Sequence, residues 1–162
     1  MTPDVTPEAL DGPAGRELLA ELDQDLNVRY GDDETVTVHP AQFLPPDGIF
    51  LVVRQAGEPL ACGGYRRIAT DTAEIKRMYV RPQARGKGLA RLVLARLEEA
   101  ASAAGYSQLW LETGLAQPEA MALYESSGYR RIAPFGQFAW APDQRCYGKV
   151  LEATPSNRAP LS

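Results

Sequence analysis

The sequence has very few residues of the kinds that bind metals or form nucleophilic triads. Among 162 residues there are one histidine, His39, and two cysteines, Cys62 and Cys146. The cysteines form no Cys-x-x-Cys pair and have no histidine near them, so the usual ligand spacings of a metal site are missing. His39 falls in a predicted loop, which leaves no base for a Ser-His-Asp triad. We therefore expect no metal, and two buried free thiols in a reducing compartment.

The sequence also lacks long hydrophobic runs and an excess of positive charge. No apolar run approaches the roughly 20 residues that cross a bilayer, so we expect no membrane-spanning segment. The N-terminal residues carry neither the basic flank nor the apolar core of a signal peptide. Lys and Arg number 17 against 21 Asp and Glu, a formal net charge of −4, which argues against nucleic acid as the main partner. The cytoplasm is the expected location.

What is present is the apolar patterning of one α/β domain over residues 1–152, followed by a Pro-, Ser- and Asn-containing tail at 153–162 that predicts disorder. The predicted helices cover Leu18, Leu19, Leu22 and Leu26, then Gly86–Ala104 and Pro118–Ser127. The predicted strands are a short one near Val5, then Ile49–Arg54, Leu60–Ile68, Ala73–Val80, Gln108–Glu112, Tyr129–Ile132 and Cys146–Leu151. A right-handed crossover joins Ala73–Val80 to Gln108–Glu112, so these two strands should be parallel within a mixed sheet.

The stretch Gln83–Ala90 (QARGKGLA) joins a predicted strand to the longest predicted amphipathic helix and contains two glycines, two cations and no anion. It is not a Walker A loop, because Gly88 rather than Ser or Thr follows Lys87. It is not a Rossmann fingerprint either, because Arg91 stands where the third glycine belongs. A helix N-terminus offers unpaired N–H groups, and glycines let a pyrophosphate come close. The stretch therefore indicates an anion site; the alternative is a glycine-rich turn with surface cations.

Two motifs in this order are similar to those of the GNAT N-acetyltransferase superfamily. Gln83–Gly88 fits the pattern Gln/Arg-x-x-Gly-x-Gly/Ala and resembles the family's acetyl-coenzyme A signature. Gln117–Tyr129 resembles the second motif, Asn-x-x-Ala-x-x-Leu-Tyr-x-x-x-Gly-Phe, with Gln117 in place of Asn and Tyr129 in place of Phe. The matching residues are Ala120, Leu123, Tyr124 and Gly128. The resemblance runs from about Ile49 to Leu151, and Pro134–Phe138 resembles a bacterial subgroup of the family.

The resemblance implies a fold and a co-substrate. The fold would be a mixed, mostly antiparallel central sheet of six or seven strands with helices on both faces, and with strands 4 and 5 parallel and splayed. The co-substrate would be acetyl-CoA, its pantetheine arm beside the predicted strand that ends at Val80 and its pyrophosphate on the glycine loop. The residues implied to bind it are Met78, Tyr79, Val80, Gln83, Arg85, Gly86, Lys87, Gly88, Leu89, Ala90 and Gln117.

The resemblance also implies catalytic roles. Tyr124 would be the general acid, since a phenol of pKa about 10 can give a proton to a departing thiolate; the alternative is a ring that only packs on the sheet. Glu74 would be the general base. On an alternating strand Glu74 shares a face with Lys76 and Met78, so Lys76 could simply pair with it. Glu112 is the rival for the base.

The amine pocket is implied to be shaped by the first helices, by the loop 40–48 after them and by the connection Ala133–Asp143 between the last two strands. Its predicted residues are Tyr30, Glu112, Phe135 and Phe138, with Trp140 as a further apolar wall; the aromatic residues could equally be loop anchors. The function implied is acetyl transfer from acetyl-CoA to a primary amine of a small molecule, by direct attack in a ternary complex. The alternatives are a protein or peptide N-acetyltransferase and a non-catalytic acyl-CoA sensor. A homodimer is a common arrangement in the family.

Overall fold

The computed structural model describes residues 2–31, 38–136 and 139–152. Its strands are β1 (Asp4–Pro7), β2 (Ile49–Gln55), β3 (Glu58–Ala69), β4 (Thr72–Val80), β5 (Gln108–Gly114), β6 (Arg130–Arg131) and β7 (Gln144–Val150). They form one seven-stranded sheet in the order β1-β2-β3-β4-β5-β7-β6. Neighbouring strands are antiparallel, apart from the parallel pair β4 and β5. The predicted mixed α/β fold is confirmed.

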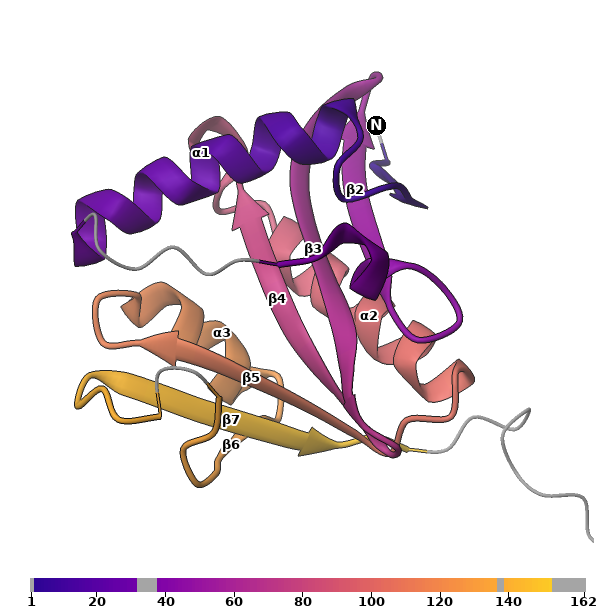
Figure 1. The fold of residues 1–162 in the computed structure, drawn as a ribbon. Coiled ribbons are helices and arrows are strands. Elements are labelled where there is room, and N and C mark those ends of the chain that lie inside the picture. The colour runs from indigo at the N-terminus through magenta and orange to yellow at the C-terminus, as the bar shows by residue number, and fades with distance from the viewer. Residues whose placement is uncertain (1, 32–37, 137–138, 153–162) are drawn as a thin grey trace, which may run out of the picture.

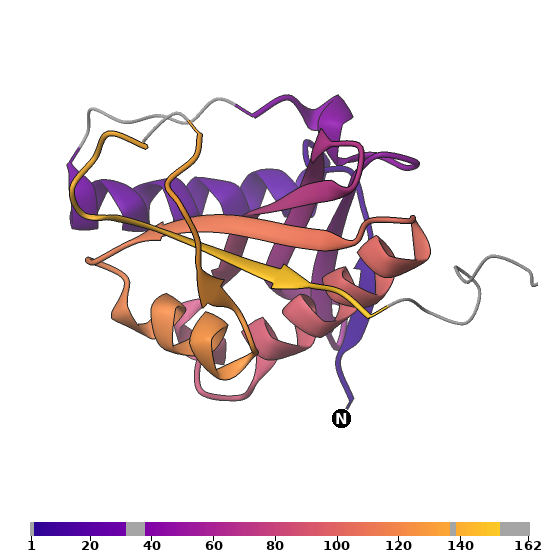
Figure 2. The same ribbon diagram turned by 90° about the horizontal axis from the view of Figure 1, so that it is seen from below.

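Helices cover both faces of this sheet (Figure 1). The α-helices are α1 (Pro13–Tyr30), α2 (Leu89–Ala103) and α3 (Pro118–Ser126), and the 3-10 helices are η1 (Pro40–Phe43) and η2 (Pro82–Ala84). Along β2, Phe50 and Val52 pack with α1, while Leu51 and Val53 pack in the core on the α2 side. Side chains of a strand alternate between faces, so one apolar strand supplies both cores. Seen from below, the sheet lies between α1 and the pair α2 and α3 (Figure 2).

The helix after the glycine loop begins later than predicted. The apolar stripe predicts a start at Gly86, but α2 begins at Leu89. Gly86 and Gly88 have φ of 79° and 80°, in the left-handed region that helices do not use. The loop is therefore a separate structural unit in front of α2. Arg96, whose position falls within the apolar stripe, is exposed to solvent as its charge requires.

The strands β4 and β5 pair over only three positions and then separate. Their Cα partners are Thr72↔Gln108, Ala73↔Leu109 and Glu74↔Trp110. Beyond Glu74, β4 keeps β3 as its neighbour on one side and has no strand on the other within the described residues. The predicted splaying is confirmed, and it leaves backbone groups of β4 open toward the gap.

A bulge on β4 lies at the same place. The partners Cys62↔Tyr79 and Gly64↔Lys76 leave one extra residue on β4. Within this stretch Arg77 has a φ of 62°, which a non-glycine residue rarely adopts. Bulges re-aim side chains and end regular pairing, and they are common beside binding sites.

This bulge corrects one sequence expectation. Lys76 lies 3.4 Å from Glu74 and so shares its face, as expected. Met78 does not: it packs in the core on the α2 side, close to Gly63, where an added Cβ would lie 2.3 Å from the Met78 sulfur. An extra residue shifts the alternation by one step, so side chains after the bulge change faces.

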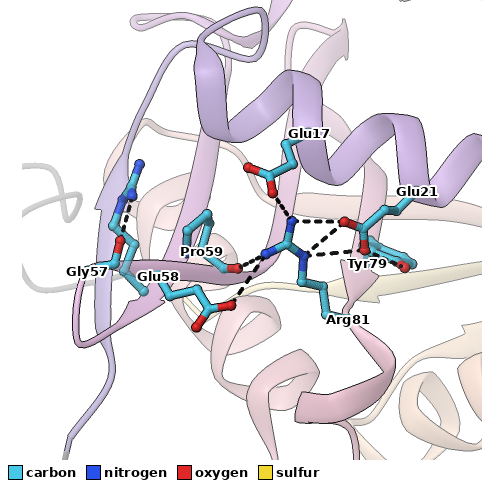
Figure 3. A network of polar contacts seen from close by, with 8 residues as sticks. Glu17, Glu21, Gly57, Glu58, Pro59, Tyr79 and Arg81 are labelled. Atoms are coloured by element: carbon cyan, nitrogen blue, oxygen red, sulfur yellow. Dashed lines mark hydrogen bonds and ion pairs between the residues drawn. The ribbon is translucent and has the colours of Figure 1, made fainter.

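Arg81, whose own side chain is buried, joins the end of β4 to α1 through a polar network (Figure 3). Its guanidinium donates to Glu21 at 3.0 Å and to the Pro59 carbonyl at 2.9 Å, and it also pairs with Glu17. The Tyr79 hydroxyl donates to the same Glu21 carboxylate at 3.2 Å. The network therefore fixes α1 beside the strand end that leads into the glycine loop.

The remaining observations concern the cysteines, membrane-spanning helices, metal ligands and the C-terminal tail. Cys62 and Cys146 are buried free thiols, as predicted. Within the described residues, none of the helices is both long and apolar enough to cross a bilayer. The same residues contain no group of three or more His, Cys, Asp or Glu side chains that could hold a metal. The predicted disordered tail, residues 153–162, lies outside the described residues.

Candidate active site

A cavity of about 490 Å³ fills the gap where β4 and β5 separate. One wall is the open edge of β4, and the other is formed by Glu112 and Thr113 of β5 together with α3. The glycine loop and the first turn of α2 close one end. Residues of α1 lie across the cavity, including Asp25 and Arg29. Separation of two sheet strands thus creates a site between elements far apart in the sequence.

The glycine loop presents unpaired backbone N–H groups to this cavity. Gly88 immediately precedes α2, and the first bond of the helix runs from the Leu92 N–H to the Gly88 carbonyl at 3.0 Å. The N–H groups of the first turn therefore have no carbonyl in the helix to bind. They coincide with the positive end of the helix dipole, which favours a phosphate. An added Cβ at Gly86 or Gly88 meets no atom within 4 Å, so space is open above both.

Three cations surround the loop, Arg85, Lys87 and Arg91. None of them forms an ion pair with a residue that the structure describes. Arg85 donates to the Val80 carbonyl at 3.0 Å, and Arg91 donates to serine hydroxyls of α3 and the residue after it. Uncompensated cations beside free N–H groups fit a pyrophosphate.

The predicted co-substrate residues line the cavity with two exceptions, Gln83 and Lys87, which are exposed. The signature pattern Gln/Arg-x-x-Gly-x-Gly/Ala also fits two residues further along, over Arg85–Ala90. The structure favours this second register, because Arg85, Gly88 and Ala90 all line the cavity. Both registers are present in the sequence, and the residues that line the cavity distinguish them.

Tyr124 lies deep in the wall of this cavity, on α3. Its ring packs at 5.9 Å from that of Tyr129 and 6.4 Å from that of Tyr147, between ring centres. Burial raises the pKa of the Tyr124 hydroxyl, so it stays protonated at neutral pH. The hydroxyl forms no hydrogen bond with the part of the chain that the structure describes. The side chain is thus a neutral donor beside the cavity.

Glu74 and Glu112 have different access to the site. Glu74 is buried, accepts from Arg66 at 3.2 Å and pairs with Lys76, and it lines neither of the cavities described here. Glu112 lines the cavity, pairs with Lys76 at 3.5 Å and accepts from the Gln144 side-chain amide. Burial raises the pKa of Glu112, with the charge of Lys76 opposing the shift. Glu112, and not Glu74, is accessible to a bound molecule.

A second cavity, of about 360 Å³, adjoins the first at Glu112, Thr113 and Gln117, which line both. Tyr30 lies on this boundary and donates to Gln117 at 3.1 Å. An added Cβ at Gly114 would lie 2.2 Å from the Tyr30 hydroxyl, so a glycine is needed for this packing. The two predicted pocket residues Tyr30 and Glu112 are therefore brought together here.

The aromatic predictions for this pocket have a different outcome. Phe135 lines neither cavity; its ring packs on Trp110 at 5.2 Å between centres, as the loop-anchor alternative expects. Phe138 lies outside the described residues. Trp140 does line the second cavity and is 72% exposed, so it is a side chain at the rim. Asp143, the last residue of the segment Ala133–Asp143 that the resemblance implies for this pocket, lines the same cavity.

Comparison with known proteins defines the class. A model of the acetyltransferase (GNAT) family matches residues 16–129, and the chain belongs to this family, whose members use acetyl-CoA. An "IAA acetyltransferase" of Azospirillum brasilense is 39% identical over 130 residues, which cover 78% of this chain and 83% of that protein. The prediction of a GNAT acetyltransferase is confirmed.

Solved structures agree with this assignment. A candidate acyl-CoA N-acyltransferase of Klebsiella pneumoniae superposes with a TM-score of 0.78 at 29% identity, covering 93% of this chain and 99% of that one. The PaiA N-acetyltransferase of Thermoplasma acidophilum, solved in complex with coenzyme A, has the same fold, with a TM-score of 0.70 at 15% identity and coverage of 93% and 99%.

Proposed function

We propose that this protein transfers the acetyl group of acetyl-CoA to a primary amine of a small molecule, within a ternary complex. The observation that carries the proposal is the pair of adjoining cavities. One begins at the glycine loop, the other opens beside Tyr30, and they meet at Glu112. Two molecules can therefore occupy the site together, so an amine can attack directly.

The chain's own residues fit acetyl-CoA. When bound, acetyl-CoA supplies an activated acetyl thioester and a pyrophosphate. The N–H groups at Gly86 and Gly88, with Arg85 and Arg91, would hold the pyrophosphate. The open edge of β4, from Met78 to Val80, would bind an extended arm through its backbone groups, as a sheet edge binds an added strand.

Glu112 and Tyr124 have complementary protonation states for this reaction. An amine attacks only when neutral, so the proton of its ammonium form must be removed, and the Glu112 carboxylate is the acceptor at the boundary of the cavities. Its raised pKa makes it a stronger base than an ordinary carboxylate. Tyr124 keeps its proton at neutral pH, so its hydroxyl can donate a hydrogen bond to the sulfur and pass it a proton as the carbon–sulfur bond breaks. Glu112 thus takes up the proton that the ammonium group loses, and Tyr124 releases a proton to the sulfur.

The test is thiol release from acetyl-CoA in the presence of a panel of small primary amines. We expect release that depends on the amine, together with an acetylated amine detected by mass spectrometry. Acetyl-CoA binding without thiol release for any amine or peptide would identify a non-catalytic sensor instead. Release with peptides but with no small amine would identify a protein or peptide acetyltransferase.

A further inference from the structure

The second cavity carries negative charge and no positive charge. Glu112 and Asp143 line it, and none of its described lining residues is Lys or Arg. Two cations beside the cavity are already engaged: Lys76 is shared between Glu74 and Glu112, and Arg145 donates to the Pro142 and Gln144 carbonyls. The internal stretches outside the described residues, 32–37 and 137–138, contain no Lys or Arg in the sequence. A molecule with a carboxylate would therefore find no unengaged cation among the described residues that line this cavity.

Glu112 and Asp143 start from well-separated backbone positions, so their carboxylates can bind different nitrogens of one molecule. Glu112 is paired with Cys146 on β7, and Asp143 precedes β7 by one residue, three steps from Cys146 along the chain. At about 3.3 Å per residue this is a separation of roughly 10 Å along the strand direction. Asp143 forms no ion pair with any residue that the structure describes. It is therefore available to a second charged group of the bound molecule.

Each end of the cavity offers further groups suited to nitrogen. Beside Glu112, the Gln144 amide nitrogen faces the carboxylate, and its oxygen is buried without a hydrogen-bond partner among the described residues. The Glu112 carboxylate is therefore the acceptor that a bound ammonium group can reach at this end. Beside Asp143, the rim carries Trp140, whose ring is mostly exposed. The face of an indole ring attracts cations.

We propose that the acceptor has two cationic nitrogens: a primary amine that is acetylated beside Glu112 and Gln144, and a second nitrogen bound between Asp143 and Trp140. This inference rests on the proposed function and narrows it to diamine-like compounds. It excludes amino-acid-like acceptors, in which a carboxylate replaces the second nitrogen. Binding of the second nitrogen orients the first, so the effect is expected mainly in KM.

The test compares three amines of the same chain length: 1,4-diaminobutane, butylamine and 4-aminobutyrate. We expect kcat/KM for the diamine to exceed that for butylamine by about tenfold, the combined effect of one exposed ion pair and one cation–π contact. The carboxylate compound should be the poorest substrate. Because the Asp143 pair is exposed, concentrated salt should reduce the preference for the diamine.

The matched variants are Asp143→Asn and Glu99→Gln. Each removes one carboxylate from an exposed position, but Glu99 lies on α2 and lines neither cavity. The diamine-to-butylamine ratio of kcat/KM should fall about three- to fivefold in Asp143→Asn, and Glu99→Gln should keep the native ratio. A thermal melt of both variants checks that they are folded, and the salt series on the native protein tests the same point without any variant.

The outcomes separate the inference from the proposed function. Equal efficiency for diamine and butylamine, or a preference for 4-aminobutyrate, would overturn the inference and leave the acetyltransferase reaction intact. A ratio unchanged in Asp143→Asn would also overturn it. No thiol release with any amine, despite acetyl-CoA binding, would overturn the proposed function and the inference with it.

Discussion

Lys76 Nζ lies 3.5 Å from Glu112 Oε1, which connects β4 to β5 beyond the last backbone pair between them. The same ammonium lies 3.4 Å from Glu74. Lys76 thus pairs with two carboxylates: Glu74, which lines neither cavity, and Glu112, which lines both. This arrangement holds Glu112 at the boundary of the two cavities, where we propose that it accepts the proton of the amine.

Replacing Glu112 with Gln should lower kcat/KM by roughly 100-fold or more, since it removes the proton acceptor while keeping the size of the side chain. The matched change Glu74→Gln leaves Lys76 paired with Glu112, so its effect on rate should be below about tenfold. Steady-state kinetics on both variants, after a check of their folding, decides the assignment. A larger rate loss in Glu74→Gln than in Glu112→Gln would return the role of base to Glu74.

The pH dependence of stability should reveal the same carboxyl group. Burial raises the pKa of Glu112 above its usual value near 4.5. Between the unfolded and folded pKa values the native state binds more protons, so the free energy of unfolding falls as pH rises through that window. Glu112→Gln lacks this proton, and its stability relative to the native protein should increase over the same window. Urea unfolding from about pH 4 to about pH 8 measures the difference; a difference that is constant with pH would contradict it.

Tyr124→Phe should retain acetyl-CoA binding and lose rate. The change removes only the hydroxyl, so the ring contacts with Tyr129 and Tyr147 persist. We expect kcat to fall about 10- to 100-fold with little change in the dissociation constant for acetyl-CoA. The control is Tyr147→Phe, which loses a hydroxyl bonded to Glu125 at 2.8 Å and lines neither cavity. Equal kinetics in native protein and Tyr124→Phe would show that Tyr124 only packs.

Arg81→Met should reduce the free energy of unfolding by about 2 kcal/mol, because it leaves Glu21 and the Pro59 carbonyl without their buried donor. Arg67→Met is the surface control: Arg67 pairs with Asp47 at 3.2 Å, but both side chains are largely exposed. Such a pair contributes at most about 1 kcal/mol. Urea unfolding of both variants gives the comparison. Equal losses would mean that the Arg81 network does not hold α1 on the sheet.

The sequence was sufficient for the elements and the class of fold. Periodic leucines predicted α1, and the change to apolar runs after Ile49 predicted the strands β2, β3 and β4. The spacing of apolar residues indicates which face of an element is buried, and each of these elements has a buried face. The residue spacing did not predict that α2 begins only at Leu89. Nothing in the spacing excludes Gly86 and Gly88 from the helix, but their positive φ values do.

The site was only partly predictable. The glycine loop and Tyr124 have local sequence patterns, and both line the first cavity. The choice between Glu74 and Glu112 depends on where β4 and β5 separate, which no local pattern records. Asp143 and Gln144 reach the site through pairing of β7 with β5. The spacing of residues along one strand does not indicate which residues of another strand lie opposite.

The central claim is that the glycine loop binds acetyl-CoA, and calorimetry on Gly86→Glu tests it most directly. Gly105→Glu is the matched control, because Gly105 also has a positive φ, 96°, and open space, at the opposite end of α2. We predict that native protein and Gly105→Glu bind acetyl-CoA, while Gly86→Glu does not, since its carboxylate occupies and repels the pyrophosphate site. Absence of binding to the native protein, or equal binding by Gly86→Glu, would contradict the account.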